Sequence, residues 1–158
     1  MAQARGYTLV ETVVVICIIS ILLALGTLRF NEYLRRYRME AQTRMIHAEL
    51  QKARTNALYE RRATRVKLYA DRFEVYSTLS DIGVAPMVSR PLSYAIVFNC
   101  GSHLDFDDRG IAMNLGSLCL NEGDGAAGVD SVVIAKTRVS LGKKDRGEAC
   151  ASASITKR

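Results

Sequence analysis

The chain has 158 residues and a formal net charge of +6, a length that suffices for about one domain and a targeting or membrane segment. The charge is banded: residues 29–72 hold 12 basic and 5 acidic side chains, residues 73–135 hold 2 and 8, and residues 136–158 hold 7 and 2. A uniformly basic surface is therefore excluded. We expect the first positive band to lie mostly along the solvated face of one helix.

The most distinctive segment is an apolar run near the N-terminus. No residue from Val13 to Leu28 is charged, and between Tyr7 and Leu28 the only charge is Glu11. At about 1.5 Å per residue, residues 7–28 span roughly 33 Å, close to the hydrocarbon thickness of a bilayer. Because backbone groups in lipid must be satisfied internally, this run predicts a membrane helix despite its β-branched residues.

Two other interpretations of the run place a cleavage site in it or before it. A secretory signal peptide would be cut near Ala24-Leu25-Gly26 and would release a soluble domain or enzyme. Cleavage at Gly6 would instead make Tyr7 the new N-terminus. An ionised carboxylate in hydrocarbon costs on the order of 2.5–3.5 kcal/mol, so Glu11 needs a cationic partner. The α-amino group of Tyr7 in a neighbouring subunit would supply one.

Residues 5–11, RGYTLVE, resemble the class III signal of type IV pilins and pseudopilins. The family pattern is a basic residue, glycine, an aromatic residue, threonine, leucine, an aliphatic residue and glutamate, followed by a long apolar helix. Tyr7 stands where phenylalanine is commoner, and the proline usual near the end of the apolar half is absent. The resemblance implies that a prepilin peptidase cuts after Gly6 and methylates Tyr7. It also implies that Glu11 pairs with a neighbouring amino terminus and sets the axial register of a filament.

The helix is expected to continue past the apolar run, because neither proline nor glycine occurs between Thr27 and Gly83. Apolar side chains recur in residues 29–62 at spacings of three and four. These positions are Leu34, Tyr37, Ala41, Met45, Ile46, Leu50, Ala53 and Ala57. The sequence therefore predicts one helix over residues 7–62, whose second half packs one stripe on a small domain.

From Thr64 onward the apolar period becomes two, which predicts strands. Residues 64–70 and 72–78 form a predicted hairpin, and residues 79–91, which carry both prolines, are expected to be a loop. The other predicted strands lie in residues 93–99, 104–113 (with a turn closed by Gly110), 117–121, 131–135 and 138–141. The expected class is α+β, a long N-terminal helix packed on a small antiparallel β-sheet domain.

Two short motifs narrow the resemblance to the GspH/FimT-like branch of minor pilins and pseudopilins. In that branch an AR-x-x-A helix end precedes a charged turn and a strand, and an F-D-x-x-G turn follows later. The residues that match are Ala53, Arg54, Ala57, Phe106, Asp107 and Gly110. The resemblance covers most of residues 5–140 and implies a pilin-like fold and a structural role rather than an enzymatic one.

Candidate catalytic and metal-binding residues are few. The sequence has no phosphate-binding glycine motif, and Cys100, His103 and Asp105 would need a further donor such as Cys119 to hold a metal. We expect no metal or cofactor there and interpret these cysteines as disulfide candidates together with Cys150. Cys100–Cys119 is the preferred pairing and Cys119–Cys150 the alternative, since sequence alone does not settle connectivity.

Two polar segments near the C-terminus carry weaker hypotheses. Residues 121–130 offer Asn121, Glu122, Asp124 and Asp130 in a glycine-rich loop, and major pseudopilins bind calcium in a late loop, but the spacing fits no defined calcium loop and a polar turn is expected. The tail is basic at Lys136, Arg138, Lys143, Lys144 and Arg146. Some FimT-like minor pilins of competence pili bind DNA through such a region, by salt-dependent phosphate contacts.

Together these inferences predict four segments. They are a leader at residues 1–6, a membrane and filament-core helix at 7–28, an amphipathic continuation at 29–62 and a periplasmic β-rich domain with a basic tail at 63–158. The resemblance implies a subunit of a type IV pilus or a type II secretion pseudopilus, first held in the bacterial inner membrane and then assembled. The implied partners are the prepilin peptidase, other pilin subunits, the inner-membrane assembly platform and, in the DNA-uptake alternative, DNA.

Overall fold

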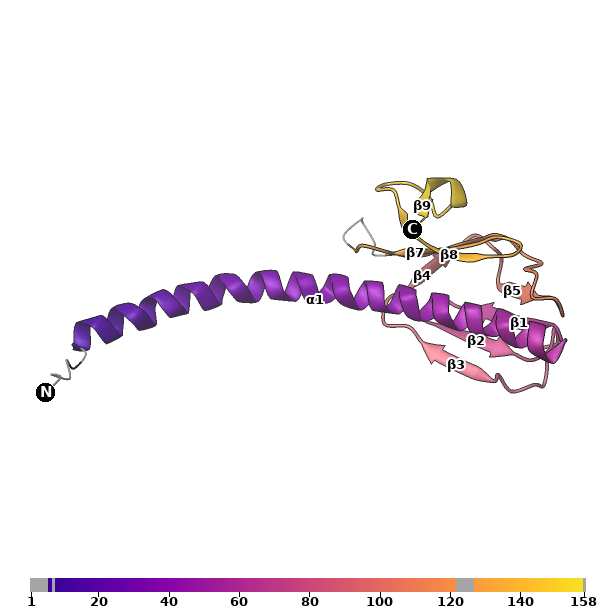
Figure 1. Cartoon of the computed structure of the whole chain (residues 1–158), viewed down its shortest axis with the longest axis horizontal. Coiled ribbons are helices and arrows are strands. Elements are labelled where there is room, and N and C mark those ends of the chain that lie inside the picture. Colours follow the sequence, from indigo (N-terminus) through magenta and orange to yellow (C-terminus); the bar gives the residue numbers. More distant parts are fainter. Residues whose placement is uncertain (1–5, 7, 122–126, 158) are drawn as a thin grey trace, which may run out of the picture. The chain divides into compact units, whose positions relative to one another are not determined.

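The computed structural model describes residues 6, 8–121 and 127–157. The chain divides into two compact units, residues 1–35 and residues 36–158. The helix α1, Leu9–Glu60, contributes residues to both units, and every strand belongs to the second (Figure 1). The observed class is α+β, as predicted, with a long N-terminal helix and antiparallel sheets.

Both ends of α1 have local causes. At the start, Thr8 Oγ1 accepts a hydrogen bond from the N–H of Glu11 at 3.2 Å, which makes Thr8 the N-cap and Glu11 the third helical residue. At the end, Arg61 has φ 49°, and the N–H of Arg62 donates to the carbonyl of Ala57 at 3.2 Å. This left-handed cap stops the helix two residues before the predicted limit.

From Leu9 to Leu23, α1 presents aliphatic side chains on every side, and Glu11 is the only charged residue there. Its large aliphatic side chains from Leu9 to Leu23 are each about half or more exposed, with Leu9 at 80%. No helix among the described residues combines the length and the hydropathy that a membrane span requires.

In the second unit, one stripe of α1 is buried in the core. Ile46, Leu50, Ala53 and Ala57 lie in it, as the spacing predicted. The stripe begins at Met39 rather than at Leu34 or Tyr37, and Tyr37 is 63% exposed, so the predicted start was wrong. Met39, Thr43, Ile46 and Leu50 recur at intervals of three and four, whereas Tyr37 is two residues from Met39 and points about 200° away from it.

The strands of the predicted antiparallel domain form two sheets. Sheet A has the order β3-β2-β1-β5, and sheet B has the order β4-β6-β7-β8-β9. The strands of sheet A are β1 (Thr64–Leu68), β2 (Arg72–Tyr76), β3 (Val88–Pro91) and β5 (His103–Phe106). Those of sheet B are β4 (Ile96–Phe98), β6 (Gly116–Leu120), β7 (Ser131–Ile134), β8 (Val139–Lys144) and β9 (Ile155–Lys157), with a short 3₁₀ turn, Ser152–Ser154, before β9.

Several strand boundaries in the structure differ from the predicted ones. The β1–β2 hairpin is as expected, but β3 occupies the end of the predicted loop 79–91. It is an edge strand that ends at Pro91, where a missing N–H is tolerated. The second half of the predicted strand pair 104–113 is reduced to a single bridge between Phe106 and Ala112. The strand β9 was not predicted.

The core of the second unit lies between α1 and the two sheets. Val66, Leu104 and Phe106 of sheet A and Leu118 and Val132 of sheet B are almost completely buried and belong to one cluster with the helix stripe. On the other face of sheet B, Cys119, Val133 and Ile155 form a second small cluster against Cys150. The C-terminal segment therefore covers the outer face of sheet B.

Candidate assembly surfaces

The apolar part of α1 has the chemistry of a buried helix. A helix that is hydrophobic on all sides is found in a protein core or a membrane rather than in water. Two of its hydroxyl groups are satisfied within the helix, since Ser20 Oγ donates to the carbonyl of Ile16 at 2.8 Å and Thr12 Oγ1 donates to that of Thr8 at 3.3 Å. This segment can therefore enter an apolar environment without leaving those hydroxyls unsatisfied.

Glu11 lies in the first turn of this helix and is exposed. Its position three residues after the cap Thr8 is that of the glutamate in a capping box, and a carboxylate there is favoured by the helix dipole. Sequence reasoning identified the carboxylate but missed Thr8, although the T-x-x-E spacing was a readable signal. Gly6 is described and exposed, whereas Tyr7 lies outside the described residues.

The two motifs of the narrower resemblance meet in the structure. Arg54 Nε donates to the carbonyl of Gly110 at 2.8 Å, and a Cβ placed on Gly110 would lie 3.3 Å from Arg54 Cγ. Gly110 has φ 69°, which favours glycine, and Asp107 Oδ1 accepts from the N–H groups of Arg109 and Ile111. The hydrogen bond from Arg54 therefore links the C-terminal end of α1 to the turn after β5.

A charged network covers the outer face of sheet A. Arg65 donates two hydrogen bonds to Asp105, both at 2.8 Å, and the two residues are register partners on β1 and β5. Asp81, from the loop that follows β2, forms ion pairs with Lys67 and, at 3.7 Å, with Arg65. Asp81 therefore holds that loop against the sheet, a role that the sequence did not reveal.

This network shifts the titration of its members. The hydrogen bond from Lys67 lowers the pKa of Asp81, and the same bond raises the pKa of Lys67. Hydrogen bonding to Asp105 raises the pKa of Arg65. Since the folded-state pKa of Asp81 lies below its unfolded value, its stabilising effect is present above the unfolded pKa and is lost as the pH falls through the folded one.

The cysteines pair differently from the preferred expectation. A disulfide joins Cys119 on β6 to Cys150 in the C-terminal segment, while Cys100 is a buried free thiol whose pKa is raised by burial. Cys119 is the register partner of Val97, whereas Cys100 lies against Gly116, three residues from Cys119 along β6. That offset is about 10 Å, too far for a disulfide. The preferred Cys100–Cys119 pairing is therefore wrong.

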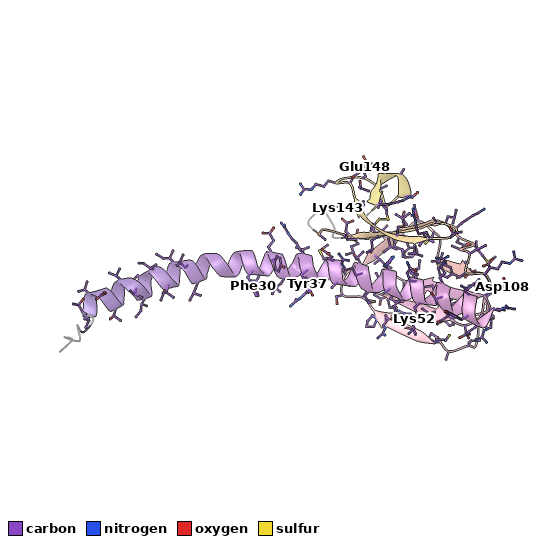
Figure 2. All side chains as sticks on the ribbon, in the orientation of Figure 1. Phe30, Tyr37, Lys52, Asp108, Lys143 and Glu148 are labelled. Atoms are coloured by element: carbon purple, nitrogen blue, oxygen red, sulfur yellow. A yellow bond between two sulfur atoms is a disulfide. The ribbon has the colours of Figure 1, made fainter. Side chains whose placement is uncertain are left out.

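The predicted basic cluster is split into two groups. Lys136 and Arg138 lie in the turn before β8, whereas Lys143, Lys144 and Arg146 lie at its far end, about 17 Å away along the strand. The second group is joined by Lys157 of β9, which is the register partner of Gly142. Figure 2 shows Lys143 and Asp108 at opposite ends of the second unit.

No group of side chains with metal-ligand geometry occurs within the described part of the chain. His103 Nε2 lies 3.7 Å from Asp105 Oδ2, but Cys100 is in the hydrophobic core. In the predicted polar loop, Glu122 and Asp124 lie outside the described residues. Asp130 is buried, and its Oδ1 accepts from Ser131 Oγ at 2.6 Å and from the N–H of Lys144 at 2.7 Å, so that oxygen already fixes the end of β8.

Comparison with known proteins gives the fold. No family model matches the chain, and no curated protein matches it. Two crystal structures of the type IV minor pilin FimU from Pseudomonas aeruginosa strain PAO1 do. The P21 form superposes with a TM-score of 0.56 at 18% identity and covers 77% of this chain and 98% of that one. The P65 form gives 0.54 at 19% identity, covering 73% and 98%. The helix, the two antiparallel sheets and this likeness together give the chain a pilin-like fold.

Proposed function

We propose that the chain is a minor pilin or pseudopilin, a structural subunit of a type IV pilus or a type II secretion pseudopilus. The observation that carries the proposal is the part of α1 from Leu9 to Leu23, which exposes aliphatic side chains on every side while the hydroxyls of Thr12 and Ser20 are satisfied internally. Such a surface needs an apolar partner, and helices of neighbouring subunits supply one. The pilin-like fold supports the same role.

In this proposal the chain is made as a precursor with a leader at residues 1–6. The apolar residues 7–28 hold it in the inner membrane with the second unit in the periplasm, until a prepilin peptidase cuts after Gly6 and methylates Tyr7. Glu11 then attracts the new amino group of a neighbouring subunit as the assembly platform adds the chain to the filament. The two charges are of opposite sign, and their pairing removes an isolated carboxylate from the apolar interior.

A pair of substitutions at Glu11 separates this charge role from helix capping. We expect Glu11→Gln to be processed normally but to be reduced at least about tenfold in sheared filaments, since glutamine preserves the cap position and removes the charge. The measurement is N-terminal sequencing together with the amount of the chain in filaments and in membranes.

Thr8→Ala is the matched control for capping. It removes the cap oxygen and leaves the carboxylate, so it should assemble better than Glu11→Gln. If Glu11→Gln enters filaments as well as the natural chain, the charge role is wrong. A mature chain that begins at Thr27 rather than at methylated Tyr7 would contradict the whole proposal.

DNA binding is a second candidate, favoured by the basic group Lys143, Lys144, Arg146 and Lys157 at one end of sheet B. Contacts with about four phosphates would weaken binding roughly 10²-fold between 50 and 200 mM salt. We expect glutamate at Lys143, Lys144 and Arg146 to abolish a gel shift of duplex DNA by the detergent-solubilised full chain. Glutamate at Lys136 and Arg138 is the control and should retain it. Equal loss in both variants, or no shift by the natural chain, excludes this candidate.

A further inference from the structure

We propose that one end of the second unit docks on the surface of an anionic lipid membrane, through an apolar loop and the basic side chains that surround it. The loop joins β2 to β3 and spans residues 77–87. This contact goes beyond the proposed filament role, since it involves no other subunit and uses a surface of the second unit alone.

Four chain connections meet at this end of the second unit. Thr64 at the start of β1 pairs with Phe106 at the end of β5, and β2 ends beside the start of β1 because the two strands are antiparallel. The end of α1, the loop after β2 and the turn after β5 therefore lie together (Figure 1). The N–H of Ala112 donates to the carbonyl of Lys136 at 2.9 Å, which adds the β7–β8 turn. We call this the loop end, and it comprises residues 54–62, 77–87, 107–113 and 135–138.

The loop presents an apolar tip whose neighbouring charge is already paired. Ile82 at the tip is 89% exposed, and Val84 and Met87 are also exposed. Asp81 is the only charged residue of the loop, and it forms an ion pair with Lys67 of β1. The tip can therefore enter an apolar environment without carrying an unpaired carboxylate with it, which would be costly.

The backbone of the loop is fixed on both sides of the tip. Thr78 Oγ1 donates to the carbonyl of Ser80 at 2.6 Å, and the N–H of Met87 donates to the carbonyl of Val75 at 2.7 Å. Gly83, with φ 75°, forms the turn at the tip. Because the loop is held in this way before it meets a partner, docking costs little further conformational entropy.

The end of α1 adds two exposed side chains of similar chemistry. Tyr59 is 83% exposed and Leu58 is 54% exposed. Tyrosine is enriched at the headgroup level of bilayers, because its ring is apolar and its hydroxyl is polar. Together with Ile82 and Met87, these residues give the loop end more exposed apolar surface than scattered single side chains would, which marks a contact site.

Basic side chains outnumber acidic ones around the apolar tip. Residues 54–62, 107–113 and 135–138 contain six basic and three acidic residues, a net charge of +3. Arg109 and Arg138 are exposed and form no ion pair within the described part of the chain. This excess of positive charge attracts anionic surfaces.

The apolar tip and the basic surroundings together select a membrane as the partner. Nucleic acid supplies phosphates for Arg109 and Arg138 but no apolar phase for Ile82. An apolar protein pocket accepts Ile82 but leaves the basic side chains without a partner. An anionic bilayer supplies both, because its phosphates face the basic side chains and its acyl chains receive the tip.

Docking between two kinds of vesicle tests this contact with the full chain. The chain is reconstituted into phosphatidylcholine vesicles, and separate dye-loaded vesicles are added. Target vesicles of phosphatidylglycerol and phosphatidylcholine in equal parts should sediment with the protein-bearing vesicles, and targets of phosphatidylcholine alone should do so at least about tenfold less. The readout is the dye recovered in the pellet.

Two variants separate the basic and the apolar contributions. Arg109→Glu together with Arg138→Glu should lower the docked fraction at least about tenfold, since two attractions to the anionic surface become repulsions. Ile82→Ser should lower it about tenfold, since the apolar anchor is lost. All three positions are exposed, so these chains should fold normally, which circular dichroism checks. Lys143→Glu together with Arg146→Glu is the control, because it changes the charge equally at the far end of β8 and should retain docking.

A fluorescent label reports whether the tip itself enters the bilayer. In a Cys17→Ser background, an environment-sensitive fluorophore at Ile82→Cys should shift to the blue when anionic target vesicles are added. Cys100 stays unlabelled because it is buried. The matched label position is Asp71→Cys, because the Asp71 side chain is 75% exposed and lies in the β1–β2 hairpin, at the other end of β2. It should show no shift.

Several results would overturn the proposal. They are equal docking to anionic and neutral vesicles, equal loss in the Lys143 and Arg146 control, and an equal blue shift at the two label positions. Binding of duplex DNA or of a second copy at the loop end, with no docking to anionic vesicles, would overturn it as well. Filament content is measured for the same chains. If the natural chain enters filaments without docking, only the membrane contact is wrong; if it docks but never enters filaments, only the proposed function is wrong.

Discussion

Replacing Cys150 by serine is expected to lower the free energy of unfolding by about 3–4 kcal/mol, because the Cys119–Cys150 disulfide closes a loop across a sequence separation of 31 residues. The lost constraint frees the segment that covers Cys119, Val133 and Ile155 on the outer face of sheet B. Urea denaturation of the detergent-solubilised full chain, followed by circular dichroism, measures the change.

Reduction supplies the internal control for this prediction. Dithiothreitol should destabilise the natural chain by a similar amount and leave the Cys150→Ser chain unchanged. Cys17→Ser should have no effect, because Cys17 is an exposed free thiol on α1. If Cys100→Ser, rather than Cys150→Ser, abolishes the response to dithiothreitol, the disulfide assignment is wrong.

The second large effect is expected at Asp105, which is only 6% exposed and accepts both hydrogen bonds from Arg65. We expect Asp105→Ala to lower the free energy of unfolding by about 3 kcal/mol, since removing one member of a largely buried ion pair leaves the other charge uncompensated. Asp81 lies near Arg65 and offsets only part of this loss, because its closest contact to Arg65 is 3.7 Å.

The matched control is an ion pair in water. Glu60→Ala breaks the pair between Glu60 and Arg62, whose side chains are 44% and 54% exposed, and should change stability by less than about 0.5 kcal/mol. Asp105→Asn keeps the shape and loses the charge, so its effect should lie between the two. The same denaturation assay applies, and an Asp105→Ala effect no larger than that of Glu60→Ala would contradict the account.

The helix and the paired strands could be predicted because their signals are local. Spacings of three and four placed Ile46, Leu50 and Ala57 on the buried stripe, and alternation placed the β1–β2 hairpin. The start of the stripe could not be placed, since Tyr37 and Met39 fit different faces and only the position of the sheets selects Met39.

The features that depend on distant partners were the ones missed. The strand β3 ends in Pro91 and is marked by its pairing with β2, not by its own composition. The pairing of Cys119 follows from the return of the C-terminal segment over sheet B, and β9 exists only as the partner of β8. The ion pairs of Asp81 likewise join the loop after β2 to Lys67 and Arg65, and both of these residues precede Asp81 by more than ten positions. Short-range periodicity contains none of this information.

The Cys119–Cys150 bond also limits how far the polypeptide can lengthen under tension. When the chain is pulled at its two termini, the force passes through the Cys119–Cys150 bond. The residues between these two cysteines, which are 31 positions apart, therefore do not extend. At about 3.5 Å per residue this withholds roughly 110 Å of contour length. The strands β7 and β8 lie wholly inside that sheltered loop, so part of sheet B bears no direct load while the bond is intact.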